Sequence, residues 1–156
     1  MAIEKSAVGA PFDSLDYNQI VAYKYENSGD RNPVVYTRNF GLITVIEKQH
    51  AFNQEQADQF LQLLTSKKTY GGMRMSCFEP RLGIVFYKDG KYIDQISVCM
   101  ECNYLESELI IPAYVGQQKR SEKSGYKAKT DYGFSRSGRK GLEEMLQEFG
   151  FKPKED

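Results

Sequence analysis

Apolar and polar residues alternate with a period of two along the first third of this chain. The run QIVAYKY begins at Gln19, and as a half-buried strand it would place Ile20, Ala22 and Lys24 on one face and Val21, Tyr23 and Tyr25 on the other. This alternation is typical of β-strands, because successive side chains of a strand point to opposite faces. Three such segments precede the first helix pattern, and they predict strands over residues 17–25, Val34–Thr37 and Phe40–Gln49.

Two later segments instead repeat apolar residues at intervals of three and four. They are Ala57, Phe60, Leu61 and Leu64 in the first, and Leu142, Met145, Leu146 and Phe149 in the second. This spacing forms one stripe on an amphipathic helix. Asn53 with Gln56 three residues later matches a capping box, and Gly150 is a typical helix terminator. The pattern predicts helices over about 54–66 and 137–149.

A β-hairpin is predicted in the middle of the chain. Asp89-Gly90 separates two apolar-rich runs, Leu82–Tyr87 and Tyr92–Val98. Asp-Gly is favoured in two-residue hairpin loops, because both central residues of a type I′ turn need a positive φ.

The turn also predicts a register. With Lys88 opposite Lys91, the other pairs are Phe86 with Ile93, Ile84 with Gln95, Leu82 with Ser97 and, at the far end, Cys77 with Cys102. Directly opposed Cβ atoms lie roughly 4.5–5.5 Å apart, close to the geometry of a disulfide. A Cys77–Cys102 disulfide is therefore one expectation, provided that Pro80 introduces no bulge.

The elements together predict one α+β domain over residues 1–156. The expected architecture is a two-layer sandwich, in which a mostly antiparallel sheet is built round the 82–98 hairpin and each of the two helices covers one face. Leu105–Pro112 is predicted as a last short strand. Residues 1–15 are predicted to be frayed, and residues 113–134 to form a long basic loop.

Composition narrows the classes of partner. The 156 residues contain 21 Lys and Arg against 21 Asp and Glu, so no net field attracts nucleic acid or an anionic membrane. No apolar run approaches the roughly 18 residues of a membrane span. The first residues lack the apolar core of a signal peptide, which predicts a cytoplasmic protein unless an export signal has been removed.

The cysteines are the main candidates for chemistry. Cys77, Cys99 and Cys102, together with the single His50, could form a Cys3His zinc site. Alternatively, Cys99 and Cys102 could form a thiol-redox pair, although Glu101 lies between them and extended residues follow. The thiols could also be buried simply as small hydrophobic groups.

No catalytic arrangement emerges from the other residues, since the single histidine is far in sequence from Ser135 and Ser137. The basic loop interleaves aromatic and basic side chains that could contact a partner, and these are Lys119, Arg120, Lys123, Tyr126 and Lys127. The alternative for them is a solvated loop. The sequence thus favours a non-enzymatic binding or interaction protein. Its expected contact surface is the cysteine-bearing end of the hairpin with the loop over 113–134, and another protein is one candidate partner. A zinc-stabilised or thiol-redox protein is the alternative.

The hairpin also resembles the signature of a known family. Residues 77–103 read CFEPRLGIVFYKDGKYIDQISVCMECN, and Gly133–Gly138 reads GFSRSG. Both resemble a family of small uncharacterised bacterial proteins, often from Bacteroidetes, that combine a Cys-Phe-x-Pro-Arg start, a Cys-x-x-Cys end and a closing helix. The resemblance is tight over 77–103 and loose over most of 17–151. It implies the importance of the hairpin and no particular activity.

Overall fold

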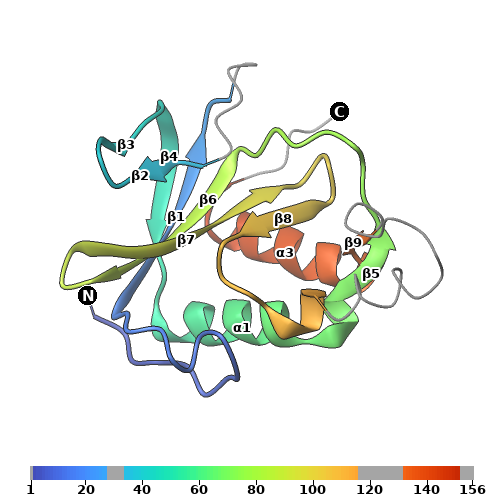
Figure 1. Ribbon diagram of the computed structural model, residues 1–156, viewed down its shortest axis with the longest axis horizontal. Helices are drawn as coiled ribbons and strands as arrows, with labels where there is room; N and C mark the ends of the chain where they lie inside the picture. Colours follow the sequence, from blue (N-terminus) through green and yellow to red (C-terminus); the bar gives the residue numbers. More distant parts are fainter. Residues whose placement is uncertain (1, 28–33, 116–131, 152–156) are drawn as a thin grey trace.

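A five-stranded antiparallel sheet forms the centre of the fold (Figure 1). The computed structural model describes residues 2–27, 34–115 and 132–151. The sheet order is β4 (Ile46–Ala51), β1 (Gln19–Tyr25), β6 (Leu82–Lys88), β7 (Lys91–Cys99) and β8 (Tyr104–Ser107). With the helices that follow, this sheet gives the predicted α+β fold.

Smaller elements surround the sheet. Two-residue strands β2 (Tyr36–Thr37) and β3 (Gly41–Leu42) pair with each other, as do β5 (Tyr70–Met73) and β9 (Tyr132–Phe134). The helices are α1 (Gln54–Thr65), the 3-10 turn η1 (Lys67–Thr69) and α3 (Arg136–Glu148), and residues 112–115 are also helical. Within the described ranges, no helix combines the length and apolar character needed to cross a membrane.

Both long helices cover the same face of the sheet. Phe60 of α1 and Leu142 of α3 belong to one buried cluster with Ile84 and Phe86 of the sheet. The expectation of one helix on each face was therefore wrong. The opposite face is covered in part by residues around β2, where Val35 packs in a second, smaller cluster.

The Asp89-Gly90 turn is confirmed, but the predicted register holds only next to it. Asp89 and Gly90 have φ angles of 50° and 80°, and Lys88 lies opposite Lys91. An irregularity between Phe86 and Tyr87 then shifts the pairing by one residue.

The shifted pairs are Phe86 with Asp94, Ile84 with Ile96 and Leu82 with Val98. Ile84, Ile96 and Val98 are all buried. In the predicted register the polar Gln95 and Ser97 would instead have faced the core, because a one-residue slip exchanges the faces of a strand. The free energy gained by burying these apolar pairs thus outweighs the cost of interrupting the regular pairing of the two strands.

The predicted strand Phe40–Gln49 is divided in two. Gly41 has a φ of 71°, β3 ends at Leu42, and β4 begins only at Ile46. The alternating pattern misled because Phe40 remains 82% exposed rather than packing on the sheet. The strand predicted over Leu105–Pro112 is likewise confined to β8 and ends at Ser107.

The expectation of a frayed N-terminal segment was wrong for the described residues. Phe12 is fully buried, and its ring stacks on Phe86 with the centroids 5.7 Å apart. The Ile3 N–H donates to the Asn18 carbonyl at 2.8 Å. Because these apolar side chains fill one end of the core, the segment is held in place.

The predicted loop over 113–134 has structure at both ends. Its first residues belong to the helical residues 112–115, and its last three form β9. β9 was not predicted because Gly133 gives it little strand character. Residues 116–131 lie outside the described residues.

Gly138 allows α3 to approach η1 closely. A Cβ at this position would lie 2.2 Å from the Thr69 carbonyl oxygen, which is a backbone atom. We predict that Gly138→Ala destabilises the protein by roughly 1–3 kcal/mol in urea unfolding, because overpacking outweighs the better helix propensity of alanine.

Gly141 in the same helix provides the matched control. A Cβ there would meet only the flexible Leu63 side chain, at 3.1 Å. Gly141→Ala should leave stability within about 1 kcal/mol of the parent protein or raise it. Equal effects of the two substitutions would contradict the close-approach explanation.

Candidate functional site

An open groove lies on the sheet face that the helices do not cover, between β2 and β8. Its volume is about 840 Å³. The lining comes from residues 34, 36–38 and 74, from residues 92, 94, 95 and 97 of β7, and from residues 105–111, 114 and 115. We call this feature the β7–β8 groove. Its size is in the range of pockets that hold small molecules or short peptide segments.

One wall of the groove is a stack of aromatic and guanidinium groups. The rings of Tyr36 and Tyr92 are parallel within 4°, with centroids 4.3 Å apart. The Arg38 guanidinium carbon lies 5.3 Å from the Tyr92 centroid, and Tyr36 also meets Tyr87 edge-on. Such stacks add stabilisation beyond area burial and restrict the motion of each ring.

A side-chain amide holds that wall in place. Gln95 of β7 donates from Nε2 to the Tyr36 carbonyl at 2.7 Å and accepts at Oε1 from the Tyr36 N–H at 3.3 Å. The amide therefore pairs with β2 as a neighbouring strand would. Because backbone polar groups at a partly buried position need partners, this pair fixes the β2–β3 hairpin over the sheet.

Carboxylates lie along the groove. Asp94, Glu106 and Glu108 all belong to its lining. Burial raises the pKa of Asp94, and Glu108 raises it further, whereas the Gln95 N–H at 2.8 Å and Arg38 lower it. The protonation of Asp94 therefore depends on the charges of Glu108 and Arg38.

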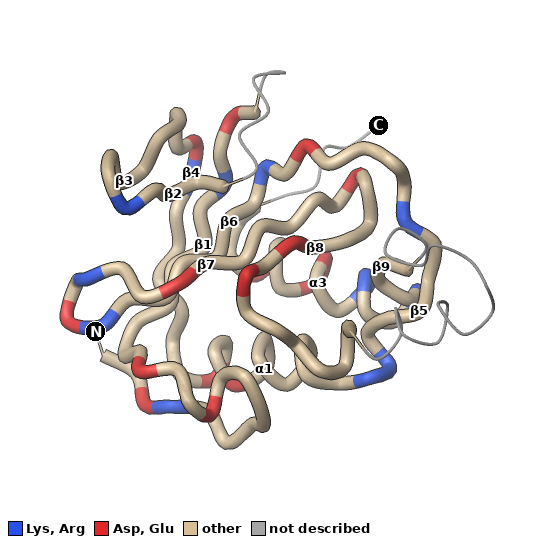
Figure 2. The backbone as a smooth tube through the Cα atoms, viewed as in Figure 1, with Lys and Arg blue, Asp and Glu red and all other residues tan. Residues whose placement is uncertain are grey.

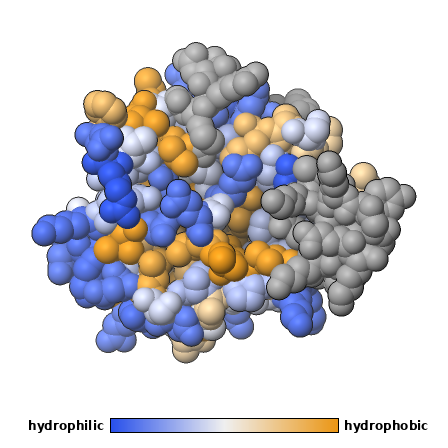
Figure 3. Space-filling model, in the orientation of Figure 1, coloured by the Kyte–Doolittle hydropathy of each residue, from blue (hydrophilic) through white to orange (hydrophobic). Residues whose placement is uncertain are grey.

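The opposite wall is apolar. Leu109, Ile110 and Ile111 follow β8, and Ile110 is 69% exposed. A band of hydrophobic residues crosses the middle of the visible face, over the segment that follows β8 (Figure 3). A groove with one aromatic, one apolar and several acidic components can distinguish ligands by charge and by shape.

Sequence reasoning missed this groove. Gln95 and Ser97 are polar residues inside an otherwise apolar strand, and they are the signal that could have indicated an open sheet face. The predicted register placed them opposite Ile84 and Leu82, so their common face was not recognised.

The three cysteines lie around the turn that follows β7 and the segment before β6. The chain turns after Cys99, and the Cys102 N–H donates to the Cys99 sulfur at 3.2 Å. The Cys99 thiol donates to the Glu79 carbonyl at 3.5 Å. The side chains of Cys77 and Cys102 are close enough to interact, and all three cysteines are free thiols.

The environment of these thiols disfavours a nucleophilic role. The hydrogen bond to Cys102 raises the pKa of Cys77, the exposed thiol. Burial raises the pKa of Cys102. Since the thiolate is the reactive species, neither group is activated at neutral pH.

His50 does not join the thiols. It lies on β4, which two intervening strands separate from β7, and its Nε2 is 2.8 Å from Gln56 Oε1 while its ring stacks on Phe149. β4 and β7 are separated by roughly 14 Å at the usual strand spacing. The structure thus brings Cys77, Cys99 and Cys102 together without His50. Across residues 2–27, 34–115 and 132–151, no group of three or more His, Cys, Asp or Glu side chains could hold a metal ion.

The predicted partner-binding residues of the basic loop cannot be placed. Lys119, Arg120, Lys123, Tyr126 and Lys127 all lie outside the described residues. Only the ends of that segment contribute to a described site, through Tyr114 and Val115 of the groove.

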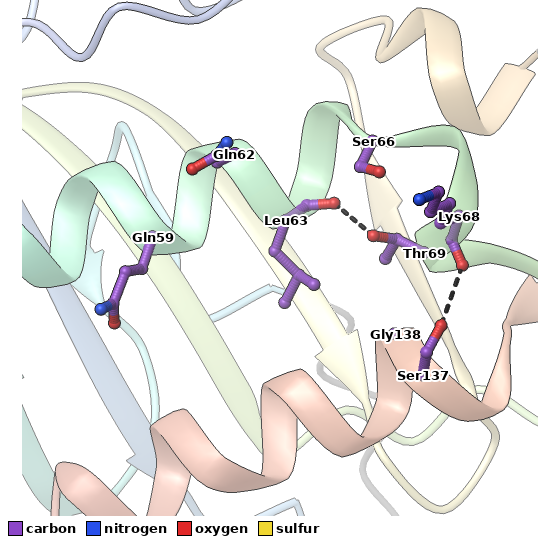
Figure 4. A pocket seen from close by; sticks show the side chains of 8 residues that line it. All are labelled: Gln59, Gln62, Leu63, Ser66, Lys68, Thr69, Ser137 and Gly138. Atoms are coloured by element: carbon purple, nitrogen blue, oxygen red, sulfur yellow. Dashed lines mark hydrogen bonds between the residues drawn. The ribbon is translucent and has the colours of Figure 1, made fainter.

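A smaller pocket of about 340 Å³ lies between the end of α1 and the start of α3 (Figure 4). Two of its three hydroxyl side chains, those of Thr69 and Ser137, have partners. Thr69 donates to the Leu63 carbonyl, and Ser137 donates to the Lys68 carbonyl at 3.3 Å. We interpret this pocket as part of the packing contact between the two helices.

The hydrogen bond between Cys77 and Cys102 predicts slow alkylation of Cys77. Iodoacetamide should modify Cys77 more slowly than an exposed model thiol, and the rate should rise as pH approaches its raised pKa. In Cys102→Ala the acceptor is lost, so the pKa of Cys77 falls and alkylation at pH 8 becomes several-fold faster. Mass spectrometry of the alkylated peptides measures the rate.

Cys99→Ser is the control for this experiment, because Cys99 does not contribute to the raised pKa of Cys77. The rate at Cys77 should stay unchanged in that variant. An unchanged rate in Cys102→Ala would contradict the hydrogen bond.

Comparisons of the chain with protein-family models, with curated proteins and with solved structures found no match.

Proposed function

We propose that this chain is a non-enzymatic binding protein and that the β7–β8 groove is its contact surface for another polypeptide. The observation that carries the proposal is the groove itself, an open volume of about 840 Å³ on a sheet face. The face is left open because β2 and β3 contain only two residues each and cover part of it.

The internal contacts of the groove support binding rather than rearrangement. Gln95 holds Tyr36, and Tyr36 stacks on Tyr92, so one wall is fixed by the fold before any ligand arrives. A preformed wall lowers the conformational entropy lost on association. The groove also offers exposed apolar area at Ile110 next to charged groups, which is a common composition for an interface.

Selection of random peptides displayed on phage tests this proposal. Glu106→Trp places an indole in the groove from an exposed position of β8. Peptides selected on the parent protein should bind this variant at least about tenfold more weakly, a loss of about 1.4 kcal/mol.

The control is Glu47→Trp, an exposed glutamate on β4 at the other edge of the same sheet. This variant should bind the selected peptides as the parent protein does. Failure to enrich any peptide, or equal binding by both variants, would argue against the groove as a contact surface.

The contact between Cys77 and Cys102 supports a second candidate function, redox-dependent crosslinking. A low-molecular-weight disulfide, such as oxidised glutathione, would accept two electrons and two protons from the thiols. Cys77 and Cys102 would form one disulfide, and the oxidant would become two thiols. The crosslink would join the segment before β6 to the turn between β7 and β8.

Treatment with oxidised glutathione at alkaline pH, where the raised pKa values of both thiols allow a thiolate to form, should lower the mass of the protein by two hydrogen atoms, and peptide mapping should identify the Cys77–Cys102 link. Closing this loop should stabilise the protein by about 3 kcal/mol in urea unfolding. Cys99→Ser should still crosslink, whereas Cys102→Ser should not. A stable mixed disulfide with glutathione at Cys77, without the internal link, would rule out this candidate.

A further inference from the structure

We infer that the β7–β8 groove receives an extended polypeptide segment with basic side chains, which pairs as an added strand with the free edge of β8. This inference names the partner for the contact surface proposed above and rests on that proposal. It is carried by three observations, which are the edge position of β8, the direction of its backbone groups and the charge of the groove.

β8 is the last strand of the five-stranded sheet, and in the described ranges β7 is its only strand partner. Residues 105–111 all line the groove in succession. Side chains of a strand alternate between two faces, so a groove lined by consecutive residues of β8 must reach the edge of the strand as well as one face. The edge of β8 therefore borders the groove.

The backbone groups that point to this edge can be identified. The Asn103 carbonyl accepts from the Phe134 N–H at 2.9 Å, and the Leu105 carbonyl accepts from the Tyr114 hydroxyl at 3.3 Å. Both carbonyls thus point away from β7. Because backbone groups alternate sides along an antiparallel strand, the N–H and carbonyl of Ser107 point the same way.

Ser107 is consequently where an incoming strand would make its backbone hydrogen bonds. The Ser107 side chain already accepts from the Leu109 N–H at 3.0 Å, which turns the following segment away from the line of β8. Exposed strand edges of this kind bind extended peptides through main-chain hydrogen bonds, while flanking side chains determine specificity.

The charge of the groove favours basic side chains on the partner. Three carboxylates line it, those of Asp94, Glu106 and Glu108, and acidic positions are visible on β8 and the segment after it (Figure 2). The two cations of the lining are stacked on aromatic rings, with Arg38 over Tyr92 and Arg74 over Tyr104.

The same carboxylates disfavour a second copy of this chain as the occupant. Pairing of two β8 edges would bring Glu106 and Glu108 of one copy close to those of the other, and opposed like charges destabilise a strand pair. The apolar wall formed by Leu109 to Ile111 instead calls for apolar side chains that alternate with the basic ones.

Fluorescence anisotropy with synthetic peptides tests the inference. The probe is a labelled peptide of alternating Lys and Val, and it is compared with an alternating Glu-Val peptide and with a Lys-Val peptide whose alternate amides are N-methylated. The Lys-Val peptide should bind at least about tenfold more tightly than either of the others. Equal affinity for the N-methylated peptide, or tighter binding of the Glu-Val peptide, would overturn the inference.

Two protein variants locate the contact. Ser107→Pro removes the N–H that faces the groove, and its affinity is compared with that of Ser107→Ala, which loses the same hydroxyl but keeps the N–H. The proline variant should bind the Lys-Val peptide at least about tenfold more weakly. The double variant Glu106→Gln, Glu108→Gln should bind it more weakly and with less dependence on salt. Equal affinities of the proline and alanine variants would overturn the inference.

Failure of the inference is distinguishable from failure of the proposed function. If selected peptides lose affinity for Glu106→Trp but tolerate N-methylation and Ser107→Pro, the groove binds polypeptides in another way. The inference then fails and the proposed function stands. If sedimentation shows a dimer of the parent protein that Ser107→Pro dissociates, a second copy is the occupant and the inference fails.

Discussion

The one-residue shift between Phe86 and Tyr87 is the constraint on which the rest of the structure depends. Beyond it, Ile96 and Val98 point into the core that α1 and α3 cover, and Gln95 and Ser97 point to the other face. Without the shift these faces would be exchanged. The shifted register is favoured because it buries the apolar side chains of β7. The same register places the polar side chains of β7 in the groove.

The second face is covered only in part, and the reason is the size of the covering hairpin. Val35 packs so closely over β6 that a Cβ at Gly83 would lie 2.5 Å from its Cγ1 atom. This close packing seals the sheet over β1 and β6. Beyond Gln95, which pairs with Tyr36, the β2–β3 hairpin ends, and β7 and β8 form the floor of an open groove. The contact surface thus arises because the β2–β3 hairpin is too short to cover the polar face of β7.

The thiol cluster is a second product of the same strand. β7 ends at Cys99, and the turn that leads into β8 brings Cys102 back toward it, with Asn103 at a φ of 64°. Cys77 arrives from the segment before β6 and meets Cys102. The cluster packs against Tyr104, whose hydroxyl donates to the Cys77 carbonyl at 3.0 Å. The groove and the thiols therefore lie at neighbouring parts of the β7–β8 hairpin.

Local patterns determined both long helices and the central hairpin turn of this protein. The Asn53 capping box, the apolar stripes of both helices and the Asp89-Gly90 turn depend on residues close in sequence, and each is present where the pattern predicted it. Tertiary structure decided what depends on distant residues. The register of β7 is set by which side chains the helices bury, Phe12 is held by Phe86, and His50 is held by Gln56 and Phe149 away from the thiols. The groove exists because the short strands β2 and β3 do not extend over β8. No local pattern in the sequence sets the extent of this hairpin, because it depends on how the whole chain packs.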